Sequence, residues 1–327
     1  MTGPAAPGVL LAQLGTPAAP TAKALRPYLR QFLGDPRVIE ANRVLWWLIL
    51  NAIVLPRRPR RSAALYRRIW TDRGSPLLLF SKAQVEGLQA VLGDTARVEL
   101  GMRYGEPSIP SAMSSLLASG IDRVLVFPMF PQYSGATTAS IYDAVFEHLR
   151  EVRVVPALRF VPPYYAHPAY IGALAAIVRE ELGRLPWKPD RILITFHGIP
   201  RRYIDKGDVY RKHSEETACL LASALELVPG EYEVSFQSRF GREEWLTPYT
   251  EEKLAELPRN GVKRVVAICP GFTADCLETL DEIGNEGKRI FQEAGGEDLR
   301  LLPCLNAHPA WIEGMATIAR EELKGWM

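Results

Sequence analysis

The strongest constraint on the fold is an internal repeat. Residues 166–182, AHPAYIGALAAIVREEL, match residues 307–323, AHPAWIEGMATIAREEL, at 11 of 17 positions. Arg-Tyr-Gly at 103–105 likewise matches Arg-Phe-Gly at 239–241. Both pairs of segments are about 140 residues apart, which is the typical length of a whole domain. Several matches in the same order predict two copies of one fold within the chain.

Short apolar runs alternate with helix-length segments in both halves. We expect strands at 8–14, 98–102, 123–127, 154–160, 191–196, 232–236 and 264–268. This alternation predicts parallel sheets with helices on both faces. The length of 327 residues suits two domains of this kind. We therefore expect a duplicated α/β fold with a cleft between the two halves.

Composition narrows the classes of function. The net charge of +2 argues against a basic nucleic-acid-binding surface. Four cysteines without a CxxC pair indicate reduced thiols in a cytosolic protein. The N-terminal residues 1–15 show no basic stretch followed by an apolar core, so we expect no signal peptide. No apolar run reaches the roughly 18 residues that a membrane-spanning helix needs.

His197 is the histidine best placed for chemistry. It follows the apolar run 191–196, and its counterpart in the first half is Leu14. Ligands bind at the carboxyl ends of strands in open α/β sheets, and a neutral imidazole there can accept a proton or bind a metal. His167 and His308 instead occupy equivalent positions before a proline that opens a helix, which indicates a structural role.

An acidic series follows the last long strand. Glu278, Glu282 and Glu286 recur every four residues in a helix expected to begin near Leu277. Residues at that spacing line one face of an α-helix, and like charges there cost about 0.2–0.5 kcal/mol per pair. The series is either a solvated helix face or a path of carboxylates for a metal cation.

One apolar segment is followed by a basic one. Val44–Leu55, VLWWLILNAIVL, precedes a run of prolines and arginines at 56–61. The apolar segment is too short to span a membrane. It is either a buried core helix or a contact for a membrane interface or an apolar ligand.

Absent motifs exclude several chemistries. The sequence has no GxGxxG, no GxxxxGK[ST], no GxSxG and no HExxH. A polar and aromatic loop at 128–138 corresponds to the loop around Phe272 and Asp275 in the second half. Two such loops facing each other predict a wide, flat slot lined by aromatic side chains.

Six segments in order carry a family resemblance. They are LLAQLGTP at 10–17, GMRYGEP at 101–107, PMFPQYSGATT at 128–138, TFHGIPRRYIDKGD at 195–208, SFQSRFGREEWLTPY at 235–249 and CPGFTADCLETLDEI at 269–283. Over nearly its whole length the chain resembles the ferrochelatases, most of all those of Gram-negative bacteria. The resemblance implies the class II chelatase fold, with two Rossmann-like domains that each hold a four-stranded parallel sheet. We expect residues 1–157 plus 306–327 in the first domain and 158–305 in the second.

The resemblance also implies the site residues. His197 and Glu278 match catalytic positions, with His197 as proton acceptor or metal ligand and Glu278 as a proton relay. The positions that match porphyrin contacts are Leu14, Arg103, Tyr104, Tyr133, Ser134, Trp245 and Phe272. The positions that it implies for metal binding are His197, Asp275, Glu278, Glu282 and Glu286, and the last two match an acidic ridge that conducts iron. Cys276 stands where many members have a histidine, so no role of that histidine transfers.

The implied reaction is the insertion of ferrous iron into protoporphyrin IX, with release of two protons, as the terminal step of heme synthesis. The apolar segment would then be a lip over the pocket, and residues 44–61 a contact for the inner membrane surface. We expect no nucleic acid partner and no resident cofactor, and no iron–sulfur cluster because no cysteine follows Cys304. The alternatives are a cobalt or nickel chelatase of a more acidic tetrapyrrole and a non-catalytic heme- or porphyrin-binding protein.

Overall fold

A computed structural model describes residues 6–327 and divides the chain into two compact units. Unit 1 comprises Met1–Pro163 and Ile312–Met327, and unit 2 comprises Tyr164–Trp311. Both boundaries lie a few residues later than the sequence suggested. The first five residues, which begin the segment in which we expected no signal peptide, lie outside the described part. The cleft expected between the halves stays a prediction.

Unit 1 is built on a four-stranded parallel sheet in the order β2-β1-β3-β4. Its strands are β1 (Gly8–Gly15), β2 (Arg97–Tyr104), β3 (Arg123–Pro128) and β4 (Ala157–Phe160). The central strands β1 and β3 are buried almost throughout because helices cover both of their faces. The apolar runs of the sequence therefore mark the strands at the centre of this sheet.

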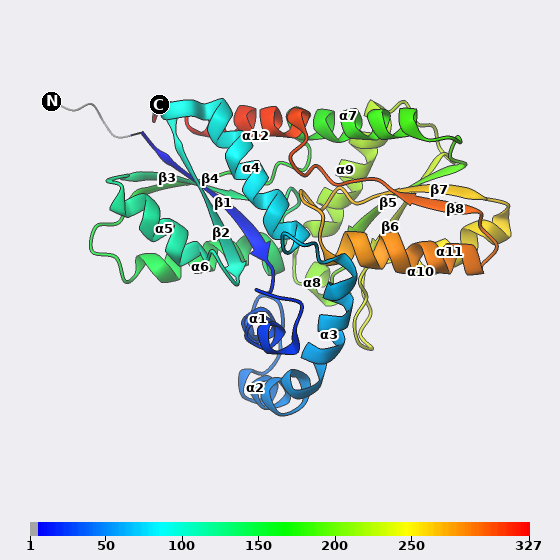
Figure 1. Cartoon of the computed structure of the whole chain (residues 1–327), viewed down its shortest axis with the longest axis horizontal. Helices are drawn as coiled ribbons and strands as arrows, with labels where there is room; N and C mark the ends of the chain where they lie inside the picture. The colour runs from blue at the N-terminus through cyan, green and yellow to red at the C-terminus, as the bar shows by residue number, and fades with distance from the viewer. Residues whose placement is uncertain (1–5) are drawn as a thin grey trace. The chain divides into compact units, whose positions relative to one another are not determined.

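Four helices cover the sheet of unit 1. These are α4 (Pro76–Leu92), α5 (Ile109–Ala118), α6 (Ser140–Leu149) and α12 (Pro309–Glu322). Helices α5 and α6 share one core with β1 and β3, while α4 and α12 lie over the opposite face (Figure 1). The Ile312 side chain packs against Gly87 of α4, where a Cβ atom would come within 2.7 Å of it. Helix α12 starts in unit 2 and belongs to unit 1 from Ile312 onward.

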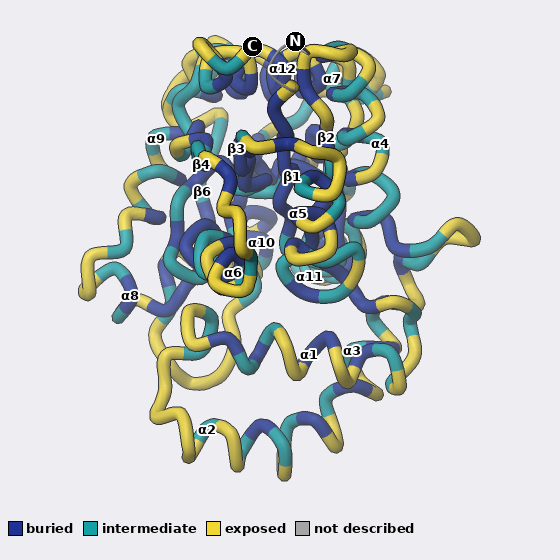
Figure 2. Tube along the Cα trace, turned by 90° about the vertical axis from the view of Figure 1, so that its left-hand side faces the viewer, coloured by how far each residue is buried: buried dark blue, intermediate teal, exposed yellow. Residues whose placement is uncertain are grey.

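A helical lobe follows β1. It consists of α1 (Ala22–Gly34), α2 (Arg43–Ile49), a π-helical turn (Leu50–Val54) and α3 (Leu55–Ile69). The last carbonyls of α1 have no partner within their own helix. Side chains of α2 cap them, because Arg43 donates to the Gly34 oxygen (2.5 Å) and the Trp46 indole N–H donates to the Leu33 oxygen (2.6 Å). Most of α2 is exposed (Figure 2).

The outer edge of β2 is closed to further strands. The Val98 amide donates to the Gln89 side-chain oxygen (2.8 Å), and the Met102 amide donates to the Pro107 carbonyl (2.6 Å). An open strand edge is a template for pairing with other chains. Gln89 and Pro107 leave only a short stretch of edge between them.

Unit 2 repeats the topology of unit 1. Its parallel sheet has the order β6-β5-β7-β8, with β5 (Arg191–His197), β6 (Tyr232–Gln237), β7 (Arg264–Ile268) and β8 (Asp298–Leu301). Each order places the first strand of its unit second and the second strand at the edge. The predicted duplicated α/β fold with two four-stranded parallel sheets is therefore confirmed, although the sequence had not located β8.

Helices also cover both faces of the sheet in unit 2. They are α7 (Pro168–Arg184), α8 (Arg201–Asp205), α9 (Tyr210–Ala224), α10 (Thr250–Glu256), a 3₁₀ turn (Leu257–Asn260), a π-helix (Glu278–Gly287) and α11 (Lys288–Glu293). Helices α10 and α11 pack on one face, and α7 and α9 lie over the other (Figure 1). His167 and His308 accept the amides of Ala169 and Ala310 through Nδ1, so each caps the start of its helix.

Candidate active site

His197 lies at the carboxyl end of β5, beside Gln237 at the end of β6. Its Nδ1 is 2.6 Å from the carbonyl oxygen of Gly198. A carbonyl can only accept a hydrogen bond, so this Nδ1 carries the proton. The neutral imidazole then keeps its lone pair on Nε2, the atom that can accept a proton or bind a metal ion.

Two aromatic rings flank this imidazole. The ring centroids of Trp245 and Phe272 lie 6.3 Å and 6.4 Å from that of His197. A Cβ atom at Gly198 would come within 2.9 Å of the Gln237 carbonyl and 3.3 Å of the Trp245 ring, so the absence of a side chain there lets the backbone approach. The structure therefore brings together three residues that the sequence had assigned to the site.

The acidic segment forms a π-helix rather than the α-helix we expected. Residues Glu278–Gly287 have the wider i→i+5 turn. Such turns are rare in proteins, and those that occur often lie at functional sites. The Gln237 amide donates to the Glu278 carbonyl (2.8 Å), so the end of β6 holds the first turn of this helix. The physical reason for the correction is contact from outside the segment: the Gln237 side chain at the end of β6 binds this helix at Glu278, and Ser238, the next residue, binds it at Glu282.

Glu282 is fixed by one residue. Its carboxylate accepts the Ser238 amide at 2.6 Å and the Ser238 hydroxyl at 2.6 Å, through separate oxygens. Ser238 adopts a left-handed backbone (φ 68°), which is uncommon for a residue with a side chain. Burial raises the pKa of the Glu282 carboxyl; Ser238 and, when it is protonated, His197 counteract this in part, whereas Glu278 raises it further.

Cys276 lies close to Glu278 and is buried. Burial raises the pKa of the Cys276 thiol well above its ordinary value, and the negative charge of Glu278 and a hydrogen bond to it raise it further. A thiol in this state stays protonated and is a hydrogen-bond donor rather than a thiolate ligand. The residue that replaces the histidine of many relatives is thus a neutral neighbour of Glu278.

The other two predicted metal residues have protein partners. Asp275 is buried, and it accepts hydrogen bonds from the Thr279 hydroxyl (2.8 Å), the Asn306 amide (2.7 Å) and the Cys304 backbone. Glu286 forms an exposed ion pair with Arg289. Within residues 6–327, no group of three His, Cys, Asp or Glu side chains is arranged to hold a metal ion. His197 and Glu278 both act on the pKa of the Glu282 carboxyl, so both lie within electrostatic reach of it.

Arg103 and Tyr104 end β2 in unit 1. The Arg103 guanidinium bonds Asp35 (2.7 Å) and the Ser140 hydroxyl (2.7 Å). Tyr104 is 1% exposed, and its hydroxyl donates to Asp35 (2.8 Å). Tyr104 therefore supports its neighbours within unit 1 instead of presenting a surface.

The remaining predicted porphyrin contacts also lie in unit 1. Leu14 and Tyr133 are partly exposed, Leu14 as the second-last residue of β1 and Tyr133 in the loop after β3. Ser134 is buried, and its hydroxyl accepts the Ala136 amide (3.3 Å) at the start of the π-helical turn Gly135–Ala139. The role of Ser134 visible in this structure is that of a helix cap.

Sequence reasoning missed four residues that organise these groups. They are Asp35, Ser140, Gln237 and Ser238, which bond Arg103, Tyr104, Glu278 or Glu282. Gln237 and Ser238 lie in the resembling segment 235–249, directly after a predicted strand, and that position was the available signal. Nothing in the local pattern around Asp35 indicated burial.

The sequence profile of the ferrochelatase family matches residues 6–323. The chain belongs to the ferrochelatase family. The ferrochelatase of Herminiimonas arsenicoxydans is 50% identical over 321 residues, which are 97% of this chain and 87% of that protein. Ferrochelatase 1 of Shewanella oneidensis is 48% identical over 336 residues, covering 100% of this chain and 99% of the relative.

Solved structures support the fold alone. SirB from Bacillus subtilis with Fe³⁺ has a TM-score of 0.56 at 17% identity and covers 76% of this chain and 92% of its own. DR2241 from Deinococcus radiodurans, described as similar to chelatases, has a TM-score of 0.51 at 19% identity, covering 76% and 53%. Its membership of the ferrochelatase family, and not these structures, identifies the chain as a metal chelatase of the lyase class that inserts iron into a porphyrin in heme synthesis.

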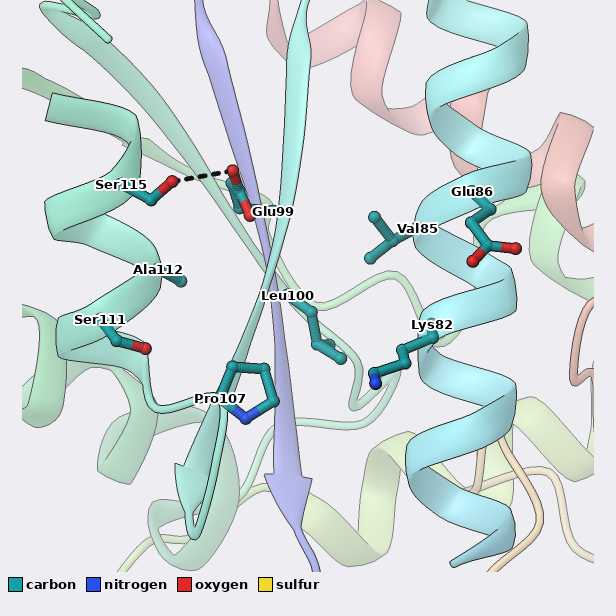
Figure 3. Close-up of a pocket in the computed structure, with 9 residues that line it drawn as sticks. All are labelled: Lys82, Val85, Glu86, Glu99, Leu100, Pro107, Ser111, Ala112 and Ser115. Carbon is teal, nitrogen blue, oxygen red and sulfur yellow. Dashed lines mark hydrogen bonds between the residues drawn. The ribbon is translucent and has the colours of Figure 1, made fainter. Parts of the chain in front are cut away.

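One pocket of this ferrochelatase lies apart from all the candidate residues. It measures about 330 Å³ and opens beside the short free edge of β2, between α4 and α5 (Figure 3). Lys82 and Glu86 come from α4, Glu99 from β2, and Ser115 of α5 donates to Glu99 (3.0 Å). None of the predicted site residues lines it.

Proposed function

We propose that this ferrochelatase inserts ferrous iron into protoporphyrin IX with His197 as the proton acceptor and Glu278 as the relay. The observation that carries the proposal is the hydrogen bond from His197 Nδ1–H to the Gly198 carbonyl. It fixes the tautomer whose Nε2 is free to accept a proton.

The reaction exchanges two pyrrole N–H protons of the porphyrin for one divalent cation. His197 takes a proton at Nε2 as the pyrrole nitrogen gains the metal ion. Glu278, close enough to Glu282 and Cys276 to affect their pKa values, passes the proton on, and its own carboxylate is ready for the next. Trp245 and Phe272 support a flat macrocycle beside the imidazole. Carboxylate oxygens of Glu278 and Glu282 suit a labile ferrous ion on its way to the ring.

Arg103 supports the choice of a porphyrin with carboxylate side chains. Its guanidinium is a planar donor that matches a propionate in a two-pronged geometry. This preference also separates the proposal from its alternatives. A cobalt or nickel chelatase would turn over only a more acidic tetrapyrrole, and a carrier would bind porphyrin stoichiometrically without turnover.

The deciding experiment replaces His197 by alanine. Purified protein is incubated anaerobically with protoporphyrin IX and Fe²⁺, or with Zn²⁺, and the absorbance change on metallation is followed. A positioned general base contributes about 10²- to 10⁴-fold, so we expect His197→Ala to lower kcat by at least about 100-fold. His148→Ala is the control, since His148 lies in the last turn of α6. Near-normal kcat in His197→Ala would refute the proposal.

We further propose that the exposed face of α2 and the arginines of α3, within residues 44–61, contact the inner surface of the plasma membrane, and that the protein is otherwise cytoplasmic. Val44, Leu45, Trp47, Leu48 and Ile53 are each more than half exposed. Arg57, Arg60 and Arg61 are exposed just after them. Apolar side chains beside cations suit an anionic lipid surface. Among the described helices, none combines the length and apolarity needed to cross a bilayer.

We also propose that the protein works without an iron–sulfur cluster. Such clusters are held by about four thiolates. Cys219 is exposed on α9, whereas Cys269, Cys276 and Cys304 are buried. The three buried thiols are too few for that coordination. Sulfide-to-iron absorption in the visible spectrum of the pure protein would contradict the proposal.

A further inference from the structure

Asp35 is the centre of a buried polar network in unit 1. It ends α1, and its side chain is 2% exposed. Its Oδ2 accepts hydrogen bonds from Ser140 Oγ (2.6 Å), Arg103 Nη2 (2.7 Å) and the Tyr104 hydroxyl (2.8 Å). Its Oδ1 accepts the Arg37 amide (2.7 Å). Three elements that lie far apart in the sequence, α1, β2 and α6, thus meet at one carboxylate.

The contacts of Asp35 determine the protonation states of the groups in this network. Burial raises the pKa of Asp35, but the hydrogen bonds from Ser140, Tyr104 and the Arg37 amide and the charge of Arg103 more than offset it, so the pKa lies below its ordinary value. Asp35 is therefore an anion at neutral pH. Burial and the adjacent Asp35 charge raise the pKa of Tyr104 strongly, so its hydroxyl stays protonated and remains a donor.

The network forms hydrogen bonds with only one side of the Arg103 guanidinium. Nε–H donates to Ser140 Oγ, and one Nη2–H donates to Asp35. These two nitrogens form the lateral edge of the planar group. The end of the group, made by Nη1 and the second Nη2–H, has no hydrogen-bond partner among the described residues, and the side chain is 19% exposed. That end is a two-pronged donor for a further carboxylate.

We propose that Asp35 is a positioning residue for substrate binding, which holds Arg103 by its lateral edge so that its end faces a porphyrin propionate in the correct orientation. The inference rests on the proposed function, in which Arg103 contacts the substrate. An arginine side chain has many rotamers, and a fixed one loses less entropy when the carboxylate binds. Ser140 fixes the same edge, while the Tyr104 hydroxyl donates to Asp35 and its ring lies against the guanidinium, with Arg103 Cζ 4.9 Å from the ring centroid.

The competing explanation is a purely structural ion pair. Such a pair would stabilise the junction of α1, β2 and α6 and would not distinguish one substrate of the enzyme from another. The two explanations differ in what Asp35→Asn does to the Michaelis constants. Positioning predicts that KM for protoporphyrin IX rises about tenfold, while kcat and KM for Zn²⁺ stay within about twofold. A structural role predicts lower folded content with unchanged constants for the folded fraction.

The first test is a double-mutant cycle with Arg103→Ala in the full chain. If Asp35 acts through Arg103, the double variant has the same porphyrin KM as Arg103→Ala alone. If the two substitutions instead raise the porphyrin KM independently, so that their factors multiply in the double variant, the positioning role is overturned. An Arg103→Ala variant with normal porphyrin KM also overturns it, and shows that the failing step is the contact of Arg103 with substrate. Absence of metal insertion by the unmodified chain would instead refute the proposed function.

The second test uses the dimethyl ester of the porphyrin in detergent. A neutral ester cannot take the two-pronged geometry of a carboxylate, so Asp35→Asn and the unmodified protein should have equal KM values for it. A tenfold difference with the ester as well would overturn the proposal.

Two further variants keep the test informative if Asp35→Asn folds poorly. Ser140→Ala removes the partner of Nε and should raise porphyrin KM by about threefold without affecting KM for Zn²⁺. Asp143→Asn is the matched control: it makes the same change in the same unit, at the exposed ion pair with Arg37 (2.7 Å). We expect unchanged constants for Asp143→Asn, and an unchanged porphyrin KM in Ser140→Ala would overturn the proposal.

Discussion

Replacing the exposed apolar side chains of α2 should weaken binding to anionic vesicles by a calculable factor. Val44, Trp47 and Leu48 are 73%, 62% and 51% exposed and, together with Leu45 (58%), form the exposed apolar surface of α2. Trp46 and Ile49, in contrast, are partly covered, and Trp46 caps α1. The informative variant is therefore Val44→Ser/Trp47→Ser/Leu48→Ser.

The magnitude follows from the exposed fractions. Full burial of such a side chain is worth about 1.5–3 kcal/mol, so the exposed parts of the three amount to about 4 kcal/mol. A helix at the interface transfers only part of this surface into the acyl region, and we take half, about 2 kcal/mol. Since about 1.4 kcal/mol corresponds to a factor of ten, the partition coefficient should fall about 30-fold.

The assay is co-sedimentation with vesicles of equal parts phosphatidylglycerol and phosphatidylcholine. Val154→Ser/Val155→Ser/Val228→Ser is the matched control, because these valines are 77%, 57% and 56% exposed outside the helical lobe. We expect the control to bind as the unmodified protein does. Binding of the α2 variant within about twofold of the unmodified protein would refute the reasoning, and so would equal loss in the control.

Charge provides a second arm of the same assay. Each arginine near an anionic surface contributes about 1 kcal/mol, so Arg57→Gln/Arg60→Gln/Arg61→Gln should lower binding by about 100-fold at low salt. The loss should vanish on vesicles of phosphatidylcholine alone. An equal loss on neutral vesicles would show that the substitutions act through folding.

Three further predictions concern stability and reactivity. Trp46→Phe removes the cap on the Leu33 carbonyl and should lower the free energy of unfolding by about 1 kcal/mol, measured by urea denaturation with Trp46→Tyr for comparison. Asp35 and Glu282 should respond to pH with opposite signs. Folding lowers the pKa of Asp35, so the ionised carboxylate stabilises the protein above about pH 4 and this stabilisation is lost on acidification. Asp35→Asn should therefore be less stable than the unmodified protein at pH 7, and the two proteins should become equally stable below about pH 4. Folding raises the pKa of Glu282, so ionisation of this carboxyl above about pH 4 destabilises the folded state. Glu282→Gln should therefore be more stable than the unmodified protein at pH 7 but not at about pH 4. A loss of stability in Glu282→Gln at pH 7 would contradict this prediction. A thiol reagent at pH 8 should label Cys219 alone, because the other three thiols are buried with raised pKa values; mass spectrometry showing labelled Cys269 in folded protein would refute this.

The central strands were predictable because burial on both faces requires continuous apolar runs. Strand β5 and its end at His197 follow directly from such a run. Strand β8 escaped because it lies at an edge and only Leu299 of its four residues is fully buried, between Asp298 and Arg300. A short edge strand of this kind has no continuous apolar run in the sequence, so the pattern did not predict it.

The π-helix could not be read from the spacing of its glutamates. Residues four apart are neighbours on both an α-helix and a π-helix, so Glu278 and Glu282 fit either. Contacts from Gln237 and Ser238, more than 40 positions away in sequence, hold this segment. Asp35 was missed for the same reason, since Arg103 and Ser140 lie 68 and 105 positions from it.

The division of unit 1 between the two ends of the chain has a consequence for how the protein is made. Synthesis proceeds from the N-terminus, and domains that are continuous in sequence fold as they emerge. Unit 2 is continuous and can fold first, whereas unit 1 must wait for its last residues. Arg123 donates to the Trp326 carbonyl (2.8 Å), and Arg159 to the Glu322 carbonyl (2.6 Å), so β3 and β4 acquire these partners only when the final helix has left the ribosome. Until then, the surface of α4 at Gly87 that Ile312 covers in the finished protein stays open in the nascent first half.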